Sequence, residues 1–266
     1  MKISNAKLAN GNLVNVEISN GLITKVDKAT AGNVTDGIDA KSKLLIPGLV
    51  DLHTHLREPG FEQSETVLTG TQAAAMGGFT AVHAMANTSP VADTAGVVEQ
   101  VAALGREAGY ADVYPIGAVT VGLEDKQLAE LGAMANSKAQ VRVFSDDGKC
   151  VHDPVLMQRL AQSRMPLTVC PLSNLKLCVF KNLADHNLGQ MLDAGLCVTI
   201  NSDDPAYFGG YLNDNYLQTF AALHLNAQQA YKLAANSIEA SFAPEADKHR
   251  WMHELKVCFQ GFAEQD

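Results

Sequence analysis

Short apolar runs alternate with turn signals over the first 43 residues of the chain. The stretch AKLANGNLVNVEISNGLITKV contains two Asn-Gly steps. Because Asn and Gly both tolerate the positive φ of tight hairpin turns, such steps between apolar runs are typical of hairpins. The pattern therefore predicts a small antiparallel β segment over residues 1–43.

From Leu44 onward, apolar runs of strand length alternate with amphipathic patterns of helical period. Strands that alternate with helices in this way form parallel sheets with βαβ crossovers. The predicted strands cover residues 44–53, 79–86, 112–121, 140–146, 166–172 and 196–202. The predicted helices cover residues 64–77, 92–108, 125–136, 153–164, 183–194, 211–224, 227–241 and 245–260.

Side chains that can carry chemistry follow the carboxyl ends of successive predicted strands, where a (β/α) barrel builds its active site. They are His53, Asn87, Asp147, Asn174 and Asp203. The pattern predicts an α/β, TIM-barrel-like domain over residues 44–266 that ends in helices. A doubly wound sheet is the alternative, but no G-x-G-x-x-G follows any strand. Because only about six βα units are present where a closed barrel has eight, the barrel is predicted to be incomplete.

Composition limits the classes of partner. The 266 residues include 20 Lys and Arg against 29 Asp and Glu, a net charge of −9, so the basic surface that nucleic-acid binding requires is missing. The sequence has no apolar run of about 18 residues, so no membrane span is predicted. The first residues also lack the apolar region of a secretory signal. Five cysteines without a C-x-x-C pair are expected to be reduced and mostly buried. These features predict a cytoplasmic protein that binds neither nucleic acid nor a membrane.

The strongest chemical signal is VDLHTHLREPG at residues 50–60. In a strand, residues i and i+2 point to the same face, so His53 and His55 present two imidazoles side by side. Neutral imidazole is a common ligand of zinc and related cations. The motif therefore predicts a metal site at the end of the first barrel strand.

Residues 1–155 resemble dihydroorotase of the amidohydrolase superfamily, a metal-dependent hydrolase with a TIM-barrel fold. The resemblance rests on IPGLVDLHTHLREPG, GGFTAVHAMANTSPVADT, GAVTVG, LAELGAM and FSDDGKCVHDP. It implies that His53, His55 and Asp147 bind one or two divalent cations, zinc or alternatively manganese. It also implies that Arg57 and Asn87 hold the carboxylate of the substrate. The guanidinium fork of Arg57 suits that role because it pairs with a carboxylate through two hydrogen bonds.

From about residue 153, the chain resembles adenine deaminase of the adenosine deaminase family instead. The motifs are DPVLMQRLAQSRMPLTVCPLSNLKLCVF, NLGQMLDAG and VTINSDDPAYFGGYL. In that family's pattern Asp203 is a metal ligand, Asp204 bonds the purine, and Ser173-Asn174 lie on the loop of the preceding strand. Asp203 also falls where dihydroorotase keeps its general base. The change of resemblance indicates a chimera with a splice near residues 153–165.

The chain lacks features that both families place in the missing region. The two dihydroorotase strands that carry histidines after FSDDG are absent, as are the deaminase segments His-Ala-Gly-Glu and Asp-His-Gly. His83 and His152 are weak candidates for replacement ligands. The remaining histidines lie on or beside predicted helices and are expected to be solvated or packing residues; they are His186, His224, His249 and His253.

Three functions follow from these resemblances. The first is hydrolysis of a cyclic amide, as in the dihydroorotate–carbamoyl aspartate reaction of pyrimidine biosynthesis, with Asp203 as the proton-transferring base. The second is an aminohydrolase that acts on adenine in purine salvage, with Asp204 on the ring. The third is a catalytically inactive chimeric barrel. In each case the open barrel edges predict association with a second copy of the chain.

Overall fold

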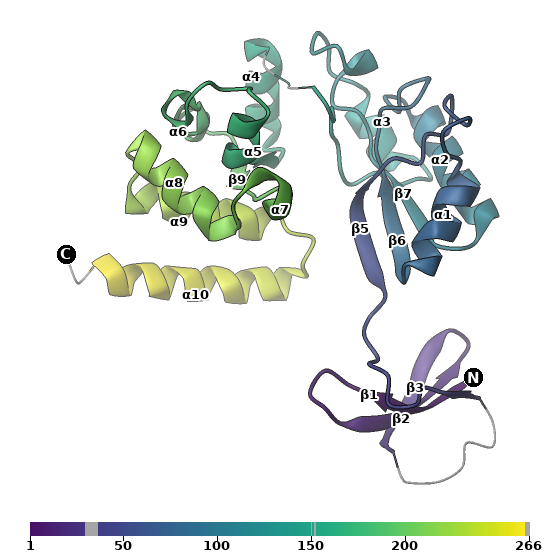
Figure 1. Ribbon diagram of the computed structural model, residues 1–266. Helices are drawn as coiled ribbons and strands as arrows, with labels where there is room; N and C mark the ends of the chain where they lie inside the picture. The colour runs from purple at the N-terminus through teal and green to yellow at the C-terminus, as the bar shows by residue number, and fades with distance from the viewer. Residues whose placement is uncertain (30–36, 150, 152, 264–266) are drawn as a thin grey trace. The chain divides into compact units, whose positions relative to one another are not determined.

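The computed structural model describes residues 1–29, 37–149, 151 and 153–263. The chain divides into two compact units, Met1–Cys150 and Val151–Asp266, and most of their helices and strands are labelled in Figure 1. The single barrel-like domain expected over residues 44–266 stays a prediction. Cys150 and His152 lie outside the described residues.

The N-terminal segment forms a four-stranded sheet in the order β3-β2-β1-β4. The strands are β1 (Lys2–Lys7), β2 (Leu13–Ser19), β3 (Leu22–Lys28) and β4 (Ile38–Asp39). Asn20 and Gly21, the second Asn-Gly step, turn the β2–β3 hairpin with φ of 51° and 74°, the positive values that this turn requires. The antiparallel pairing of β1, β2 and β3 agrees with the sequence, whereas β4 pairs with β1 in parallel.

The rest of the first unit is built on a parallel sheet in the order β5-β6-β7. Its strands are β5 (Leu49–Thr54), β6 (Phe79–Ala84) and β7 (Asp112–Pro115), and its crossover helices are α1 (Val67–Met76) and α2 (Ala95–Ala108). Val82 and Ala84 of β6 pack with Val67 of α1 and Val101 of α2 in one buried cluster. The two helices therefore cover the same face of the sheet, as the βαβ prediction requires.

The strand predicted at residues 140–146 is wrong. This segment pairs with the sheet only through an isolated bridge between Gly117 and Phe144. A parallel ladder would continue through the N–H groups of residues 115 and 119. Pro115 has no N–H to donate, and the N–H of Val119 donates to the Asp146 carboxylate. Both donors that would extend the bridge into a strand are lost.

The helix predicted at residues 125–136 begins late, as α3 (Leu131–Asn136). The preceding residues fold back on themselves, because Thr120 and Leu128 form an antiparallel bridge around a 3₁₀ turn at Val121–Leu123. Positive φ values at Gly122, Leu123 and Asp125 are incompatible with a helix there. Residues 124–130 therefore contain no helix, and only the last six residues of the prediction are helical.

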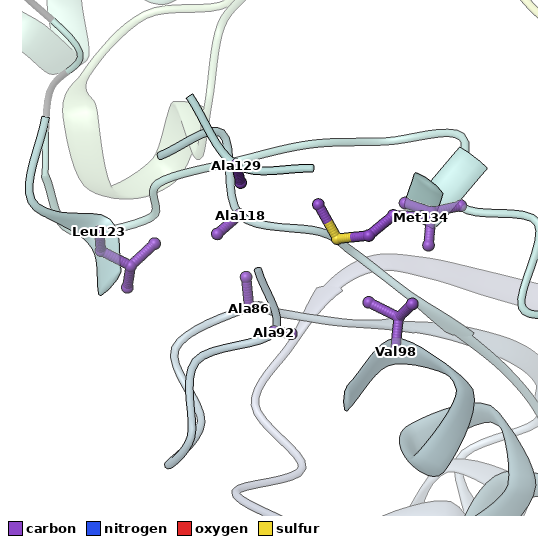
Figure 2. Close-up of a cluster of buried hydrophobic side chains, with 8 residues drawn as sticks. Ala86, Ala92, Val98, Ala118, Leu123, Ala129 and Met134 are labelled. Atoms are coloured by element: carbon purple, nitrogen blue, oxygen red, sulfur yellow. The ribbon is translucent and has the colours of Figure 1, made fainter. Parts of the chain in front are cut away.

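Beneath the ends of β6 and β7 lies a cluster of small and medium apolar side chains. Figure 2 shows how Ala86, Ala118 and Met134 approach one another from different segments. The full set of buried members is Ala86, Ala92, Val98, Ala118, Leu123, Ala129, Met134 and Val141. Ala86, Ala118 and Met134 have no exposed surface. This cluster fixes the loops that follow β6 and β7, including the backbone on either side of Asn87.

The second unit has a two-stranded parallel sheet of β8 (Leu167–Val169) and β9 (Val198–Ile200) surrounded by helices. The helices are α4 (Pro154–Ser163), α5 (Pro171–Lys176), α6 (Leu188–Asp193), α7 (Pro205–Phe208), α8 (Leu212–Leu223), α9 (Ala227–Ala240) and α10 (Glu245–Ala263). All three residues of β9 are buried, and Asn236 of α9 donates to the carbonyl of Val198 at 2.8 Å. The strands thus form a small core, as their continuous apolar runs predict.

Three details of the second unit differ from the sequence predictions. The helix expected at residues 183–194 is interrupted, because His186 is extended and its Nδ1 accepts the N–H of Leu188. Ser173 and Asn174 lie in α5 rather than in a loop. Neither α5 nor the short α7 was predicted, although each begins at a proline in the first helical position, where the fixed φ of proline favours a helix.

The predicted α/β fold with an incomplete barrel is confirmed, since the described residues form parallel sheets of three and two strands and no closed barrel. Of the four described cysteines, Cys197 is buried and Cys170 is partly buried, but Cys178 and Cys258 are exposed. The expectation of mostly buried cysteines is therefore wrong for these two. Within the described ranges, no helix combines the length and the apolar character needed to cross a membrane.

Candidate functional site

The two histidines of the H-x-H motif lie at the carboxyl end of β5. His53 is within the strand, and His55 follows its last residue, Thr54. The strand end is fixed to β6, because the Thr54 hydroxyl donates to the His83 carbonyl at 2.8 Å and Met85 N–H donates to the Thr54 carbonyl at 2.8 Å. The i, i+2 spacing brings the imidazoles together, with ring centroids 5.2 Å apart, as the strand geometry predicts.

The first aspartate of FSDDG anchors the loop that carries the second. Asp146 is buried, and its carboxylate accepts the N–H of Val119 at 2.7 Å, the N–H of Thr120 at 3.1 Å and the Thr120 hydroxyl. A buried carboxylate is stable only when hydrogen bonds compensate for its lost hydration. This anchor fixes the backbone next to Asp147, whose side chain points to the histidines.

His53, His55 and Asp147 form a group that could hold a metal ion, with one ligand atom from each within 4.8 Å of the others. His53 Nε2 lies 3.5 Å from Asp147 Oδ1, and His55 Nε2 lies 3.4 Å from Asp147 Oδ2. Two donors placed about 2.0–2.1 Å from one cation at a tetrahedral angle are roughly 3.3–3.5 Å apart. Each nitrogen–oxygen separation has the size expected for two ligands of one divalent cation, although the two run to different oxygens of Asp147. Two imidazoles with one carboxylate are a donor set that zinc accepts.

Asn87 connects two members of this group. Its Oδ1 lies 3.0 Å from His55 Nδ1, and its Nδ2 donates to Asp147 Oδ2 at 3.2 Å. The residue follows Ala86 directly, and the carbonyl of Ala86 accepts N–H bonds from Thr88 and Ala92 at 2.9 and 3.0 Å. The side chain of Asn87 is thus presented from a tightly bonded turn. Its predicted role on a substrate carboxylate stays a prediction.

Arg57 follows the motif on the loop after β5. Its backbone has a φ of 60°, and its carbonyl accepts the N–H of Phe61 at 2.9 Å. A Cβ at Gly60 would meet the carbonyl oxygen of Ser89, so this close approach of two loops requires glycine. In the described part of the chain, Arg57 makes no ion pair with its acidic neighbour Glu58, whose carboxylate accepts the Val67 N–H instead. The guanidinium group of Arg57 is therefore not paired with the carboxylate of Glu58.

The other described histidines lie outside this group. His83 is on β6, where its ring stacks on Tyr114 at 5.3 Å and its Nδ1 is buried without a hydrogen-bond partner. His186 is buried and bonds Asn174 at 3.1 Å, and loss of hydration lowers its pKa. His224 is the C-cap of α8, whereas His249 and His253 are exposed on α10. These placements agree with packing or solvated roles.

The two remaining predicted residues, Asp203 and Asp204, lie in the second unit between β9 and α7. Asp203 has a φ of 55°, and its Oδ2 accepts the Ser173 hydroxyl at 2.7 Å. Burial and the charge of Asp203 raise the pKa of the nearby Cys170 thiol to about 11, so this cysteine remains protonated. Asp204 caps α7, with its Oδ1 accepting the N–H groups of Ala206 and Tyr207. The predicted metal and purine roles of these two aspartates stay predictions.

Sequence reasoning missed two supporting residues. The sequence motifs assign no role to Asp146, and they place Ser173 beside the site without a partner. No local pattern in the sequence marks Asp146, because its hydrogen-bond partners lie 26 and 27 residues earlier in the chain. No spacing rule could show that Ser173 bonds a side chain 30 residues further along.

Two family models match the chain. Residues 42–169 match the model described as dihydro-orotase-like, and residues 146–257 match the model described as adenosine deaminase. The two resemblances inferred from the sequence motifs are therefore confirmed, and the matches overlap across the region where a splice was predicted.

Individual relatives divide in the same way. The dihydroorotase of Leifsonia xyli subsp. xyli is 66% identical over 157 residues, which are 59% of this chain and 36% of the relative. The adenine deaminase of Geotalea uraniireducens is 59% identical over 118 residues, which are 44% of this chain and 33% of the relative. The chain thus spans about a third of the length of the curated relatives it matches.

Solved structures agree on the fold. The crystal structure of adenine deaminase from Arthrobacter aurescens matches 82% of this chain and 62% of its own chain, with a TM-score of 0.56 and 32% identity. L-Hydantoinase (dihydropyrimidinase) from the same species also has a TM-score of 0.56, covering 87% of this chain and 56% of its own at 16% identity. At that identity the second likeness supports the fold alone.

Proposed function

We propose that this chain is a metal-dependent hydrolase of the amidohydrolase superfamily that opens or closes the cyclic amide of dihydroorotate. The observation that carries the proposal is the convergence of His53, His55 and Asp147 in the part of the chain that is similar to dihydroorotases. The donor set supports zinc as the cation, with manganese as the alternative.

The residues take the following proposed roles. His53, His55 and Asp147 hold the cation, which when bound lowers the pKa of a water molecule and polarises the amide carbonyl. Arg57 pairs with the carboxylate of the substrate through its guanidinium fork and so orients the ring. Asp203 is the proposed proton-transferring base, and the hydroxyl of Ser173 orients its carboxylate by a 2.7 Å hydrogen bond.

The test is to purify the chain, measure its bound metal, and assay it with added zinc or manganese on dihydroorotate, carbamoyl aspartate and adenine. We expect metal-dependent turnover of dihydroorotate that a chelator abolishes. Adenine deamination with no dihydroorotate turnover would favour the alternative that the match of residues 146–257 supports. Metal binding without turnover of either substrate would leave the chain as a catalytically inactive chimera.

Adenine deamination ranks second on chemical grounds. Adenine has no carboxylate for Arg57 to pair with. In addition, the carboxylate of Asp204 already accepts two backbone N–H groups at the start of α7. The deaminase segment that carries the catalytic glutamate has no counterpart in the sequence, and loss of a positioned proton donor typically costs roughly 10²–10⁴-fold in rate.

Substitution Arg57→Met is expected to lower kcat/KM for dihydroorotate by about ten- to a hundredfold at unchanged metal content. Hydrogen bonds to a charged group contribute roughly 1.5–3 kcal/mol, and methionine replaces the aliphatic part of the arginine side chain without the charge. Steady-state kinetics with metal analysis measure both quantities. Arg106→Met, on the exposed side of α2, is the matched control and should leave kcat/KM unchanged. Equal kcat/KM values for Arg57→Met and the unaltered chain would exclude the carboxylate-binding role.

We also propose that the chain associates with a second copy. β5 is an edge strand with exposed Val50 and Leu52, and β3 is an edge strand with exposed Ile23. Apolar strands with a free edge pair readily with another chain. Sedimentation velocity at micromolar concentration should show dimers or larger species, and Leu52→Lys together with Ile23→Lys should shift them toward monomer. A compact monomer of the unaltered chain would contradict this expectation.

A further inference from the structure

Asn87 is the one described side chain that bonds both His55 and Asp147. Its amide oxygen lies 3.0 Å from His55 Nδ1, and its amide nitrogen lies 3.2 Å from Asp147 Oδ2. The assignment of the amide follows from its partners, because a carboxylate only accepts hydrogen bonds and must face the NH₂ group. The opposite orientation would place two oxygens against each other.

This orientation determines where His55 carries its proton. An amide oxygen only accepts, so the facing Nδ1 of His55 must be the protonated nitrogen. In the neutral ring the other nitrogen, Nε2, then has a free lone pair. That same Nε2 lies 3.4 Å from Asp147 Oδ2, so a cation placed between the two atoms would be bound by this lone pair and by the carboxylate.

We propose that Asn87 is a positioning residue that fixes His55 in its Nδ1–H tautomer and holds the Asp147 carboxylate toward the histidines. Both of its hydrogen bonds thereby prepare ligand atoms before a cation arrives. The effect on cation affinity rests on the proposed metal-dependent function, whereas the tautomer of His55 can be measured in the metal-free chain. The role is distinct from binding of a substrate carboxylate.

The surroundings of Asn87 support this role. Ala86 has no exposed surface and belongs to the cluster of Figure 2. The Ala86 carbonyl bonds two following N–H groups, so the turn that presents Asn87 is constrained on both sides. Partners that orient a ligating histidine in this way typically contribute 10–100-fold to metal affinity.

His53 provides an internal comparison. Its Nε2 lies 3.5 Å from Asp147 Oδ1, but in the described ranges no side chain bonds its Nδ1. Loss of the Asn87 amide should therefore change the ring nitrogens of His55 and leave the proton distribution of His53 largely as it is. A general disturbance of the fold would change both rings.

The test uses the full chain labelled with ¹⁵N-histidine and kept free of metal. Long-range ¹H–¹⁵N spectra report the tautomer of each ring, and His55→Gln assigns the His55 signals. We expect the Nδ1–H form for His55 in the unaltered chain, its loss in Asn87→Ala, and its retention in Asn87→Asp, which still offers an acceptor to Nδ1. Zinc affinity, measured by competition with a chelating dye, should fall about 10–100-fold in Asn87→Ala.

The outcomes separate the two proposals. An Nε2–H tautomer in the unaltered chain, or the same His55 tautomer in Asn87→Ala as in the unaltered chain, would overturn the positioning role. An altered tautomer with unchanged zinc affinity would overturn the part of the proposal that links Asn87 to the cation. An unaltered chain that binds no zinc but loses the Nδ1–H form in Asn87→Ala would refute the metal-dependent function and support the positioning of His55.

Discussion

The His53→Ala chain is expected to bind zinc more than about a hundredfold less tightly than the unaltered chain. His53 and His55 reach the same carboxylate from one strand, with nitrogen–oxygen separations of 3.5 and 3.4 Å. Loss of one imidazole leaves two of three protein donors, and even partners that only orient a ligand cost 10–100-fold when removed. Metal analysis after dialysis and titration with a competing chelator measure the change.

An exposed histidine elsewhere is the appropriate control, because such residues bind zinc weakly at high concentration. His249→Ala on α10 serves this purpose, since His249 is exposed and lies in the second unit. Its affinity should equal that of the unaltered chain. If His53→Ala retained zinc as tightly as His249→Ala does, the H-x-H motif would not be a cation site.

The second large effect is expected at Asp146, which carries no proposed chemistry. Asp146→Ala would leave two buried N–H groups and the Thr120 hydroxyl without their acceptor. Each hydrogen bond to a charged acceptor contributes about 1.5–3 kcal/mol, and an unsatisfied buried donor costs a comparable amount. We therefore expect the free energy of unfolding of the first unit to fall by about 3 kcal/mol or more. Urea denaturation followed by circular dichroism gives this quantity.

The neighbouring residue is the matched comparison. Asp147 is partly exposed, and the partners of its side chain among the described residues are His and Asn side chains. Asp147→Ala should therefore change stability by no more than about 1 kcal/mol while removing the zinc site. Hydrogen exchange at Val119 and Thr120 adds a local measure, because these amides should exchange faster only in Asp146→Ala. Equal stability of the two variants would show that Asp146 is not the anchor of the loop.

The parts of the fold that follow from local periodicity were predictable. β5, β6 and their helices were located from apolar runs, and the pairing of His53 with His55 follows from strand geometry alone. The strand expected at residues 140–146 failed for a reason that lies outside it. Pro115 removes one ladder donor, which is visible in the sequence, but Asp146 removes the next by a contact 27 residues back along the chain. The apolar periodicity of a segment does not show that a distant side chain takes one of the N–H groups its strand would need.

The candidate site was likewise predictable only where local strand geometry determines it. The sequence located the two histidines and selected the second aspartate of FSDDG, which is the one that faces them. The hydrogen bonds of Asn87 join residues 32 and 60 positions apart, and no rule of spacing contains that information. The packing of the buried cluster brings the segments that carry Asn87 and Asp147 together, and this packing can be seen only in the folded chain.

The wide separation of the three candidate ligands along the chain has a consequence for folding itself. His53 and Asp147 are about 90 residues apart in the sequence, so a cation bound by both closes a long loop, the case in which a cross-link restricts the unfolded chain most. A ligand that binds only the native state adds about 2.7 kcal/mol at a free concentration of 100 times its Kd. The cation would thus link the end of β5 to the loop that carries Asp147, and a chelator would lower the stability of the first unit as well as empty the site.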